Sequence, residues 1–380
     1  MDYDVVVAGG SVAGLLCARE IASHNHKVLV IEEDSEIGTP EHCGGVVSIS
    51  AMDELGIIPM RSTLDNKIRS ATIISPSGMK FTLDARPQQV IVLDRREFDK
   101  QVAHQAKVNG VEIRVKSSLR EITKEGVRTS DGEIKCKLVV DARGVSSLIQ
   151  KDRTGILQSA QYEVYADWID KERIEVYLDQ EKYPGFFAWV IPTRSDEAKV
   201  GVAGKGINAA AVLEDFLKRK GKGKYSAIRK IFAPIWVKGP IKEFVTRNIV
   251  TVGDAAGQSK PTTAGGIYSC GIGGILAGNS ISKFLESENE SQLLEYQKSW
   301  LKKFGKEFEH MLVARSLLER LDNKTIDRLF ESITPEVLNE ISKEGSFDFH
   351  TISVAKLLGV KGSVKIVQAI LGNELRRLLT

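Results

Sequence analysis

Short apolar runs and one helical pattern alternate over the first part of the chain. Residues 4–8 and 28–31 are mostly β-branched, which is typical of buried parallel strands. Between them, residues 15–24 place apolar side chains at helical spacing, at Leu15, Leu16, Ala18, Ile21 and Ala22. The pattern predicts a strand–helix–strand unit at the N-terminus.

The middle of the chain has a different periodicity. Residues 59–93 and 160–205 alternate polar and apolar positions between Pro and Gly turns. This alternation predicts an antiparallel sheet built from two separated stretches, with a hairpin over residues 71–83. Residues 208–233 and the tail after residue 290 have helical patterns, so we expect helices there.

A glycine-rich turn joins the first predicted strand to the first predicted helix. Residues 9–14 read GGSVAG, and glycines there allow a tight turn and close approach of the backbone to a pyrophosphate. Ser11 stands where the common G-x-G-x-x-G motif has its middle glycine. Glu32 ends the second strand, where an acid accepts hydrogen bonds from an adenosine ribose. The predicted dinucleotide-binding residues are Gly9, Gly10, Ser11, Ala13, Gly14 and Glu32.

Composition and charge exclude several classes of protein. The 53 basic and 50 acidic residues give a net charge of +3, which provides no reason to expect a nucleic-acid partner. The four cysteines have no zinc-ligand spacing, so we expect no metal site; they are Cys17, Cys43, Cys136 and Cys270. The N-terminus lacks a signal-peptide pattern, and the most apolar later stretch, residues 264–278, is too short and glycine-rich to span a bilayer. We therefore predict a cytoplasmic protein without a transmembrane anchor.

Three further segments follow predicted strands or open a predicted helix. Residues 95–99 read RREFD, residues 138–147 carry a strand into a small-residue turn, and residues 248–254 end another strand ahead of Gly265-Gly266. In this order, and together with the N-terminal unit, they resemble the p-hydroxybenzoate-hydroxylase-type FAD flavoprotein superfamily over about residues 1–290. The resemblance implies FAD as the cofactor.

The same resemblance implies roles for individual residues. Asp254 would hydrogen-bond the ribityl chain of FAD. Gly265 and Gly266 would bring backbone amides to the N1–C2=O edge of the flavin, where a helix N-terminus favours the anionic reduced ring. The residues implied to bind the cofactor here are Arg95, Gly144, Gly253, Asp254, Gly265, Gly266 and Ile267.

These observations predict an α/β fold of three parts, since 380 residues are many for a single core. A Rossmann-type FAD-binding domain is interleaved with a substrate-binding domain that contains the antiparallel sheet, and a helical C-terminal region follows. The predicted boundaries are 1–58, 94–158 and 240–290 for the first domain, 59–93 and 159–239 for the second, and 291–380 for the helical region.

Two segments point to the substrate. Residues 41–45 read EHCGG, and residues 187–192 read FAWVIP. Both resemble motifs of the geranylgeranyl reductase family, particularly its archaeal lipid-reducing members, whose second motif is Y-x-W-x-F-P. Here Phe187 replaces the tyrosine and Ile191 replaces the phenylalanine, so a tyrosyl proton donor is lost at the first of these positions. The implied substrate-binding residues are Phe187, Trp189, Ile191 and Pro192.

This second resemblance implies an FAD-dependent reductase that saturates isolated double bonds of geranylgeranyl chains, on membrane-lipid precursors. Cys43 is the candidate catalytic residue, and Cys43 and Gly44 would also lie beside the flavin. A prenyl lipid would be the substrate. No second glycine-rich strand–helix–strand unit is visible in the sequence, so NAD(P)H that docks transiently or a ferredoxin-like protein would supply the electrons.

Other readings stay open at this point. The aromatic strand also fits an ordinary core strand, and Cys43 fits a packing thiol or one half of a disulfide with Cys270. A flavin monooxygenase on an apolar substrate and a non-catalytic electron-transfer flavoprotein would share the same fold. Flavin-dependent halogenases carry a W-x-W-x-I-P segment that differs by one residue, with Lys80 as the candidate catalytic lysine.

Two stretches are compatible with peripheral contact to a membrane. Residues 218–224 are a basic run that suits anionic headgroups, and residues 363–379 place apolar side chains on one helical face. A solvated loop and a helix docked on its own domain explain the same patterns.

Overall fold

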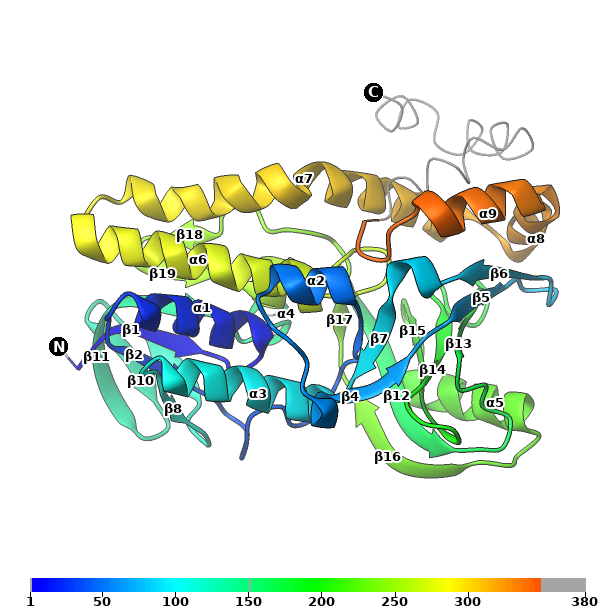
Figure 1. Cartoon of the computed structure of the whole chain (residues 1–380), viewed down its shortest axis with the longest axis horizontal. Helices are drawn as coiled ribbons and strands as arrows, with labels where there is room; N and C mark the ends of the chain where they lie inside the picture. Colours follow the sequence, from blue (N-terminus) through cyan, green and yellow to red (C-terminus); the bar gives the residue numbers. More distant parts are fainter. Residues whose placement is uncertain (1, 150–151, 350–380) are drawn as a thin grey trace.

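Two large sheets lie at opposite ends of the molecule, with helices covering one side of both (Figure 1). The structure, a computed structural model, describes residues 2–149 and 152–349. The predicted α/β fold, with a Rossmann-type part, an interleaved second sheet and a helical C-terminal region, is confirmed. The division into three domains stays a prediction.

The first sheet is parallel at its centre. In spatial order its strands are β18 (Val245–Thr246), β19 (Ile249–Thr251), β11 (Gly132–Asp141), β1 (Tyr3–Ala8), β2 (Val28–Ile31) and β8 (Glu112–Arg114). β10 (Gly126–Thr129) pairs with β11, and β9 (Leu119–Ile122) pairs with β10, both antiparallel. β2 is buried at every position, because the sheet is covered on both faces. The strands predicted from apolar runs are therefore confirmed.

Small residues bring two helices close together over this sheet. α1 (Val12–Ser23) packs along α6 (Ile267–Ser287), while α3 (Arg95–Val108) lies on the other flank of α1 (Figure 1). A Cβ atom added to Gly274 would lie 2.2 Å from the carbonyl oxygen of Ala13, and one added to Gly278 would lie 2.7 Å from that of Cys17. The glycines of α6 therefore allow its backbone to approach that of α1 closely, and this packing fixes the orientation of α6.

The second sheet contains strands from two separated stretches. In spatial order they are β16 (Ser226–Phe232), β12 (Ile156–Tyr165), β15 (Glu197–Gly204), β14 (Ala188–Pro192), β13 (Arg173–Tyr177), β5 (Ser70–Ile74) and β6 (Lys80–Asp84), and β17 (Ile235–Trp236) pairs with β12. The predicted hairpin is confirmed as β5–β6. The prediction of a wholly antiparallel sheet is wrong at one place, because β13 and β5 run parallel. No short hairpin joins these two strands, so their direction is not restricted to antiparallel.

Part of residues 59–93 forms a separate small sheet. β7 (Val90–Leu93) pairs with β3 (Val46–Ser48) on one side and β4 (Leu64–Lys67) on the other. α2 (Ile49–Glu54) follows β3 directly, and α4 (Ser146–Ile149) follows β11. The small sheet lies between the two larger ones in Figure 1.

The helix predicted over residues 208–233 is only half correct. α5 (Ala209–Gly221) ends where Lys222 and Gly223 adopt left-handed φ angles of 49° and 79°. The chain then continues as strand β16, which pairs with β12. The polar, largely exposed face of this edge strand conceals the alternation that identifies a strand in the sequence.

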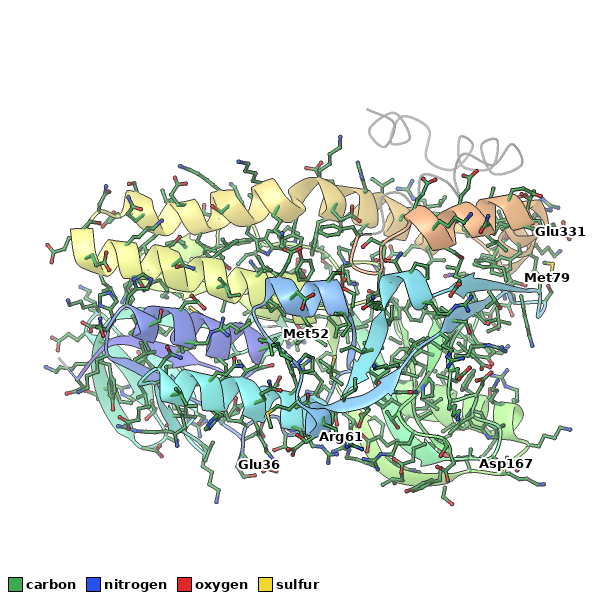
Figure 2. The ribbon with its side chains drawn as sticks, in the orientation of Figure 1. Glu36, Met52, Arg61, Met79, Asp167 and Glu331 are labelled. Atoms are coloured by element: carbon green, nitrogen blue, oxygen red, sulfur yellow. The ribbon has the colours of Figure 1, made fainter. Side chains whose placement is uncertain are left out.

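A long helix connects the two halves. α7 (Ser291–Arg320) spans about 45 Å, packs along α6, and reaches the second sheet (Figure 1). Its aromatic side chains are buried, with Trp300 and Phe308 ring centroids 4.9 Å apart, and side chains fill the space between the helical layer and the sheets (Figure 2). α8 (Asn323–Ser332) and α9 (Pro335–Glu344) follow over β5 and β6.

Among the described residues, none of the helices combines the length and the apolar character that crossing a membrane requires. The apolar helical face predicted over residues 363–379 lies outside the described residues.

Candidate active site

A cavity of about 460 Å³ opens at the carboxyl ends of the parallel strands, where the fold places ligand sites. Of the residues predicted to act, those that line it are Gly9, Gly10, Ser11, Ala13, Glu32, Cys43, Arg95, Gly144, Gly253, Asp254, Gly266 and Ile267. The predicted residues outside the lining are Gly14, Gly44, Gly265, Phe187, Trp189, Ile191 and Pro192. Segments far apart in the sequence therefore converge on one site.

The turn after β1 admits no larger residue at its start. Gly9 has a φ angle of 115°, and a Cβ atom there would lie 2.3 Å from the carbonyl oxygen of Ala142. The backbone N–H of Gly10 donates to Glu32 Oε2 at 2.7 Å, so the acid at the end of β2 already fixes the turn. Gly14 faces inward, where its Cβ would lie 2.2 Å from the Gly9 carbonyl oxygen. It therefore serves packing between helix and strand.

The serine in the glycine-rich turn has a specific partner. Ser11 Oγ donates to Asp99 Oδ2 at 3.2 Å and accepts a hydrogen bond from Arg95 Nη2 at 3.2 Å. Arg95 and Asp99 form a buried ion pair at 3.0 Å on α3. Burial opposes the charge of Arg95, but Asp99 and the nearby Cys43 thiol raise the pKa of the guanidinium above its usual value. Ser11, which replaces the middle glycine of the motif, thus connects the turn to Arg95, the arginine predicted to lie near FAD.

The cavity provides unused hydrogen-bond donors where FAD would need them. α1 and α6 both begin at the cavity without a side-chain cap, which is also true of α7 elsewhere, whereas α2, α3, α5, α8 and α9 each have such a cap. Their first N–H groups and positive dipole ends suit a pyrophosphate and the pyrimidine edge of a flavin. Ser117 Oγ is buried at the lining next to Glu32, and it has no hydrogen-bond partner in the part of the chain that the structure describes. These features fit FAD.

The end of the cavity near α6 is built around Asp254. Gly253 before it has a φ angle of 69°, and Cys270 Sγ donates to Asp254 Oδ1 at 3.4 Å. Burial raises the pKa of Asp254, although Cys270, Ser259 and Arg95 oppose this shift. All four cysteines are free thiols in the structure, so Cys43 and Cys270 are not joined.

Cys43 lies in a loop that packs between the two large sheets. Its side chain is half-buried, and Sγ accepts a hydrogen bond from the N–H of Gly45 at 3.3 Å. Its carbonyl oxygen accepts from Gln161 Nε2 on β12 at 3.4 Å. Gly44 leaves room for β14, since a Cβ atom there would lie 2.7 Å from Ile191 Cδ1. The loop therefore connects the nucleotide-binding turn to the aromatic strand.

The aromatic strand forms the layer directly behind the cavity lining. Phe186 and Phe187 stack at 4.1 Å, and both meet the Trp189 ring edge-on. This cluster also packs against Ile235 and Ala264, which line the cavity.

The polar contacts of this strand are made to the Cys43 loop, through Gln161, and to Asn66 of β4 in the small sheet. Trp189 Nε1 donates to Gln161 Oε1 at 3.1 Å, and Gln161 in turn holds Cys43. Pro192, at the end of the strand, lies apart from the cavity lining, and its carbonyl oxygen accepts from Asn66.

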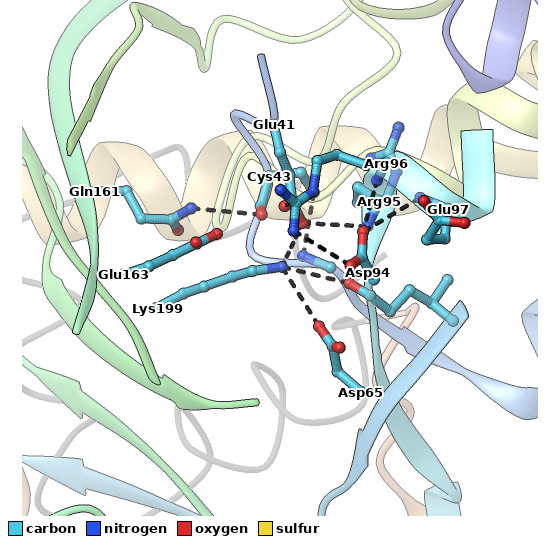
Figure 3. A network of polar contacts seen from close by, with 12 residues as sticks. Glu41, Cys43, Asp65, Asp94, Arg95, Arg96, Glu97, Gln161, Glu163 and Lys199 are labelled. Carbon is cyan, nitrogen blue, oxygen red and sulfur yellow. Dashed lines mark hydrogen bonds and ion pairs between the residues drawn. The ribbon is translucent and has the colours of Figure 1, made fainter. Parts of the chain in front are cut away.

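Sequence reasoning missed several residues of the site. Ser117, Trp236 and Asp99 line the cavity, and Glu41 joins it to a buried ionic network with Lys199 (Figure 3). A signal for Lys199 exists in the sequence: it is the one cation in strand β15, whose residues after Glu197 are otherwise small or apolar. In the ranges 2–149 and 152–349, no cluster of His, Cys, Asp or Glu is suited to hold a metal ion.

Asp65 belongs to the same network and provides a test of its electrostatics. Burial raises the pKa of Asp65 to about 6, despite Lys199 at 4.0 Å. The folded protein therefore binds more protons than the unfolded chain between about pH 4 and 6 and loses stability as pH rises through that window. We expect Asp65→Asn to raise the free energy of unfolding by about 1–3 kcal/mol near pH 8 and to change it little near pH 4, in paired denaturant titrations. A variant that is less stable than the parent near pH 8 would show that the carboxylate is needed by Lys199.

Three comparisons show which known proteins this chain resembles. The family model described as "Lycopene cyclase protein" matches residues 4–197. A digeranylgeranylglycerophospholipid reductase of Methanothermobacter thermautotrophicus is 32% identical, covering 90% of this chain and 94% of the relative. The solved structure of a geranylgeranyl bacteriochlorophyll reductase-like protein from Thermoplasma acidophilum has a TM-score of 0.87 at 26% identity, covering 98% of this chain and 99% of the other.

A solved flavin-dependent brominase, Bmp2, is more distant, with a TM-score of 0.67 at 18% identity over 98% of this chain and 99% of the other. That likeness concerns the fold alone, whereas the reductases match both the sequence and nearly the whole length. The family predicted from the EHCGG and FAWVIP segments is thereby confirmed: the chain belongs to the geranylgeranyl reductase family.

Proposed function

We propose that this chain is an FAD-dependent reductase that saturates isolated double bonds of geranylgeranyl chains on membrane-lipid precursors. The observation that carries the proposal is the position of the Cys43 loop. It links a dinucleotide-binding cavity to an aromatic strand, through Gln161 and Trp189. Relatives that match over most of the chain are named for reducing digeranylgeranylglycerophospholipids.

The two ends of the cavity have different tasks in this reaction. The turn at Gly9 and the start of α1 would hold the pyrophosphate of FAD, and Asp254 and the start of α6 would hold its ribityl chain and pyrimidine edge. FAD, when bound and reduced, supplies a hydride to one alkene carbon. The residues Gly265 and Ile267 would complete the contact with the flavin edge.

The protein must supply the proton for the other alkene carbon. An isolated alkene has no carbonyl group to activate it, so the proton has to come from a group held at the reacting carbon. Cys43 Sγ is the candidate donor, because it faces the cavity beside Arg95. The apolar layer of Phe187 and Trp189 would orient the chain and exclude water.

The product distinguishes this function from its alternatives. Purified holoprotein incubated with a prenyl lipid and a reductant is expected to add two hydrogen atoms per double bond, as measured by mass spectrometry. A flavin monooxygenase would add oxygen instead, and a halogenase would add halide. If the flavin exchanges electrons with a protein partner while the lipid stays unchanged, the chain is an electron-transfer flavoprotein. That result would contradict the proposal.

Trp189 tests the role of the aromatic layer. We expect Trp189→Ala to keep FAD but to lower kcat/KM for a prenyl lipid by about 10- to 100-fold, because the loss of apolar contact with a large, half-buried ring costs roughly 1.5–3 kcal/mol. Trp168→Ala is the matched control, since Trp168 lies in the same half of the protein, against α5, and outside the cavity lining. Equal losses in the two variants would contradict a substrate role for Trp189.

Two further proposals concern the electron donor and a contact with the membrane. We propose NAD(P)H or a ferredoxin-like protein as donor, and peripheral contact through the basic run at the end of α5. Lys220 is not available for this contact because it pairs with Glu175 at 2.6 Å, so exposed Lys218, Lys222 and Lys224 would carry it. Co-sedimentation with anionic but not neutral vesicles, lost in a Lys222→Glu/Lys224→Glu variant, is the expected result.

A further inference from the structure

The loop that carries Cys43 is held at two points, one on each side of the cysteine. On one side, Gly45 has a φ angle of 79°, and a Cβ atom there would lie 2.2 Å from the carbonyl oxygen of Leu93. The N–H of Leu93 donates to the Gly45 carbonyl at 2.9 Å. On the other side, Glu41 accepts a hydrogen bond from the N–H of Arg95 at 3.1 Å. Both anchors are therefore made to the turn between β7 and α3.

The carboxylate of Glu41 is the centre of a buried network (Figure 3). Only 1% of its side chain is exposed, and it receives donors from three elements. Lys199 Nζ of β15 lies 2.5 Å from Oε1, while Arg229 Nη2 of β16 and Arg96 Nε of α3 lie 2.9 Å and 3.5 Å from Oε2. A single side chain two residues before Cys43 thus joins two strands of the second sheet to the start of α3.

Lys199 has no comparable second partner among the described residues. Arg229 also pairs with Glu163, and Arg96 pairs with Asp94. Lys199, only 2% exposed, donates to Glu41 and to the Leu93 carbonyl at 3.3 Å, with Asp65 more distant at 4.0 Å. It therefore contacts both anchors of the loop, at Glu41 and at Leu93.

Stability alone does not account for this arrangement. A buried ion pair is replaced by apolar residues of similar volume with little or no loss of stability in many proteins, because its desolvation offsets its attraction. A directional network of charged hydrogen bonds instead fixes one geometry. Cys43 lies between the two anchors and lines the cavity, so its position determines whether its thiol can donate a proton there.

We propose that Glu41, with Lys199 as its counter-ion, is a positioning residue that holds the Cys43 loop in register, so that the thiol lies against Arg95 and the cavity. Its meaning for catalysis rests on the proposed function. The position of the loop itself can be measured without the reaction, because Cys43 is the partly exposed thiol, while Cys17, Cys136 and Cys270 are buried.

The experiment measures alkylation of Cys43 by iodoacetamide in native holoprotein, by peptide mass spectrometry, alongside kcat and KM for a prenyl lipid. We expect Glu41→Leu to change the alkylation rate by about tenfold or more and to lower kcat with a smaller change in KM. Lys199→Met is expected to have a smaller effect, since Glu41 keeps Arg229 and the Arg95 N–H. Lys220→Met breaks a less buried Lys–Glu ion pair away from the loop and is expected to leave alkylation unchanged.

The variant Glu41→Leu/Lys199→Met separates positioning from stability. Since it removes the unpaired buried ammonium, its thermal midpoint is expected to recover relative to Glu41→Leu, while alkylation and kcat stay altered. Recovery of alkylation and kcat together with stability would overturn the proposal, as would a folded Glu41→Leu protein with the parent's alkylation rate. If the parent reduces no prenyl lipid, the proposed function fails, and the alkylation result still decides the role of Glu41.

Discussion

Cys43→Ala is expected to retain FAD and to lose turnover of prenyl lipid by about 100-fold or more, the usual contribution of a positioned general acid. The cofactor should stay because its predicted contacts are made by the two helix starts, Glu32 and Arg95, and not by the thiol alone. The thermal midpoint should change little, since the side chain is half-buried and fills no large core volume. Flavin absorbance, thermal melting and lipid mass spectrometry check the three expectations.

The other cysteines provide the control for this experiment. Cys136 is buried on β11, outside the cavity lining, and lies in a cluster with Val6 and Val139. Cys136→Ala should cost some stability and leave turnover unaffected. If Cys43→Ala turns over within threefold of the parent, Cys43 packs in the site without donating a proton, and the donor has to be sought among other groups at the cavity.

Gly9→Ala is expected to abolish copurification with FAD. A left-handed φ angle of 115° already disfavours any side chain, and the new Cβ would lie 2.3 Å from the Ala142 carbonyl oxygen. Relieving that contact moves the glycine turn away from the segment directly after β11, and the same turn has to meet the pyrophosphate. We expect FAD affinity to fall by about 100-fold or more, which corresponds to roughly 2.7 kcal/mol, as measured by titration of the apoprotein.

Gly132→Ala separates backbone strain from the lost contact. Gly132 has a φ angle of 133°, but no atom of the described residues lies within 4 Å of a Cβ atom added there. This variant should lose stability by an amount similar to the strain at Gly9 and should still bind FAD. A Gly9→Ala protein with the parent's affinity for FAD would show that the cofactor does not depend on this turn.

The nucleotide-binding part of the fold was predictable because its signals are local. A buried parallel strand, a glycine turn, a helix and an acid follow one another within about thirty residues, and each leaves its own pattern in the sequence. The strand β16 was missed for the opposite reason, since it is an exposed edge whose polar face carries no alternation. The parallel pairing of β13 with β5 was missed because it joins distant stretches without a connecting hairpin.

The site was predictable to a similar extent. Residues predicted to contact a cofactor through their backbone, such as Gly9 and Gly253, stand out because their positive φ angles favour glycine. Glu41 and Ser117 did not stand out, and the lone cation Lys199 could not be paired with Glu41 from the sequence, because only tertiary structure brings these residues to the site. The serine at position 11 appeared as a departure from a motif, and its reason became visible only beside the Arg95–Asp99 pair.

The most direct test of the account is a single turnover without oxygen. Holoprotein reduced with dithionite, freed of excess reductant, and mixed with a geranylgeranyl lipid is expected to recover oxidised flavin absorbance as the lipid gains two hydrogen atoms. One double bond should be reduced for each flavin reoxidised. A reduced flavin that stays reduced with the lipid present, and a lipid of unchanged mass, would contradict the claim that this cavity delivers hydride to a prenyl chain.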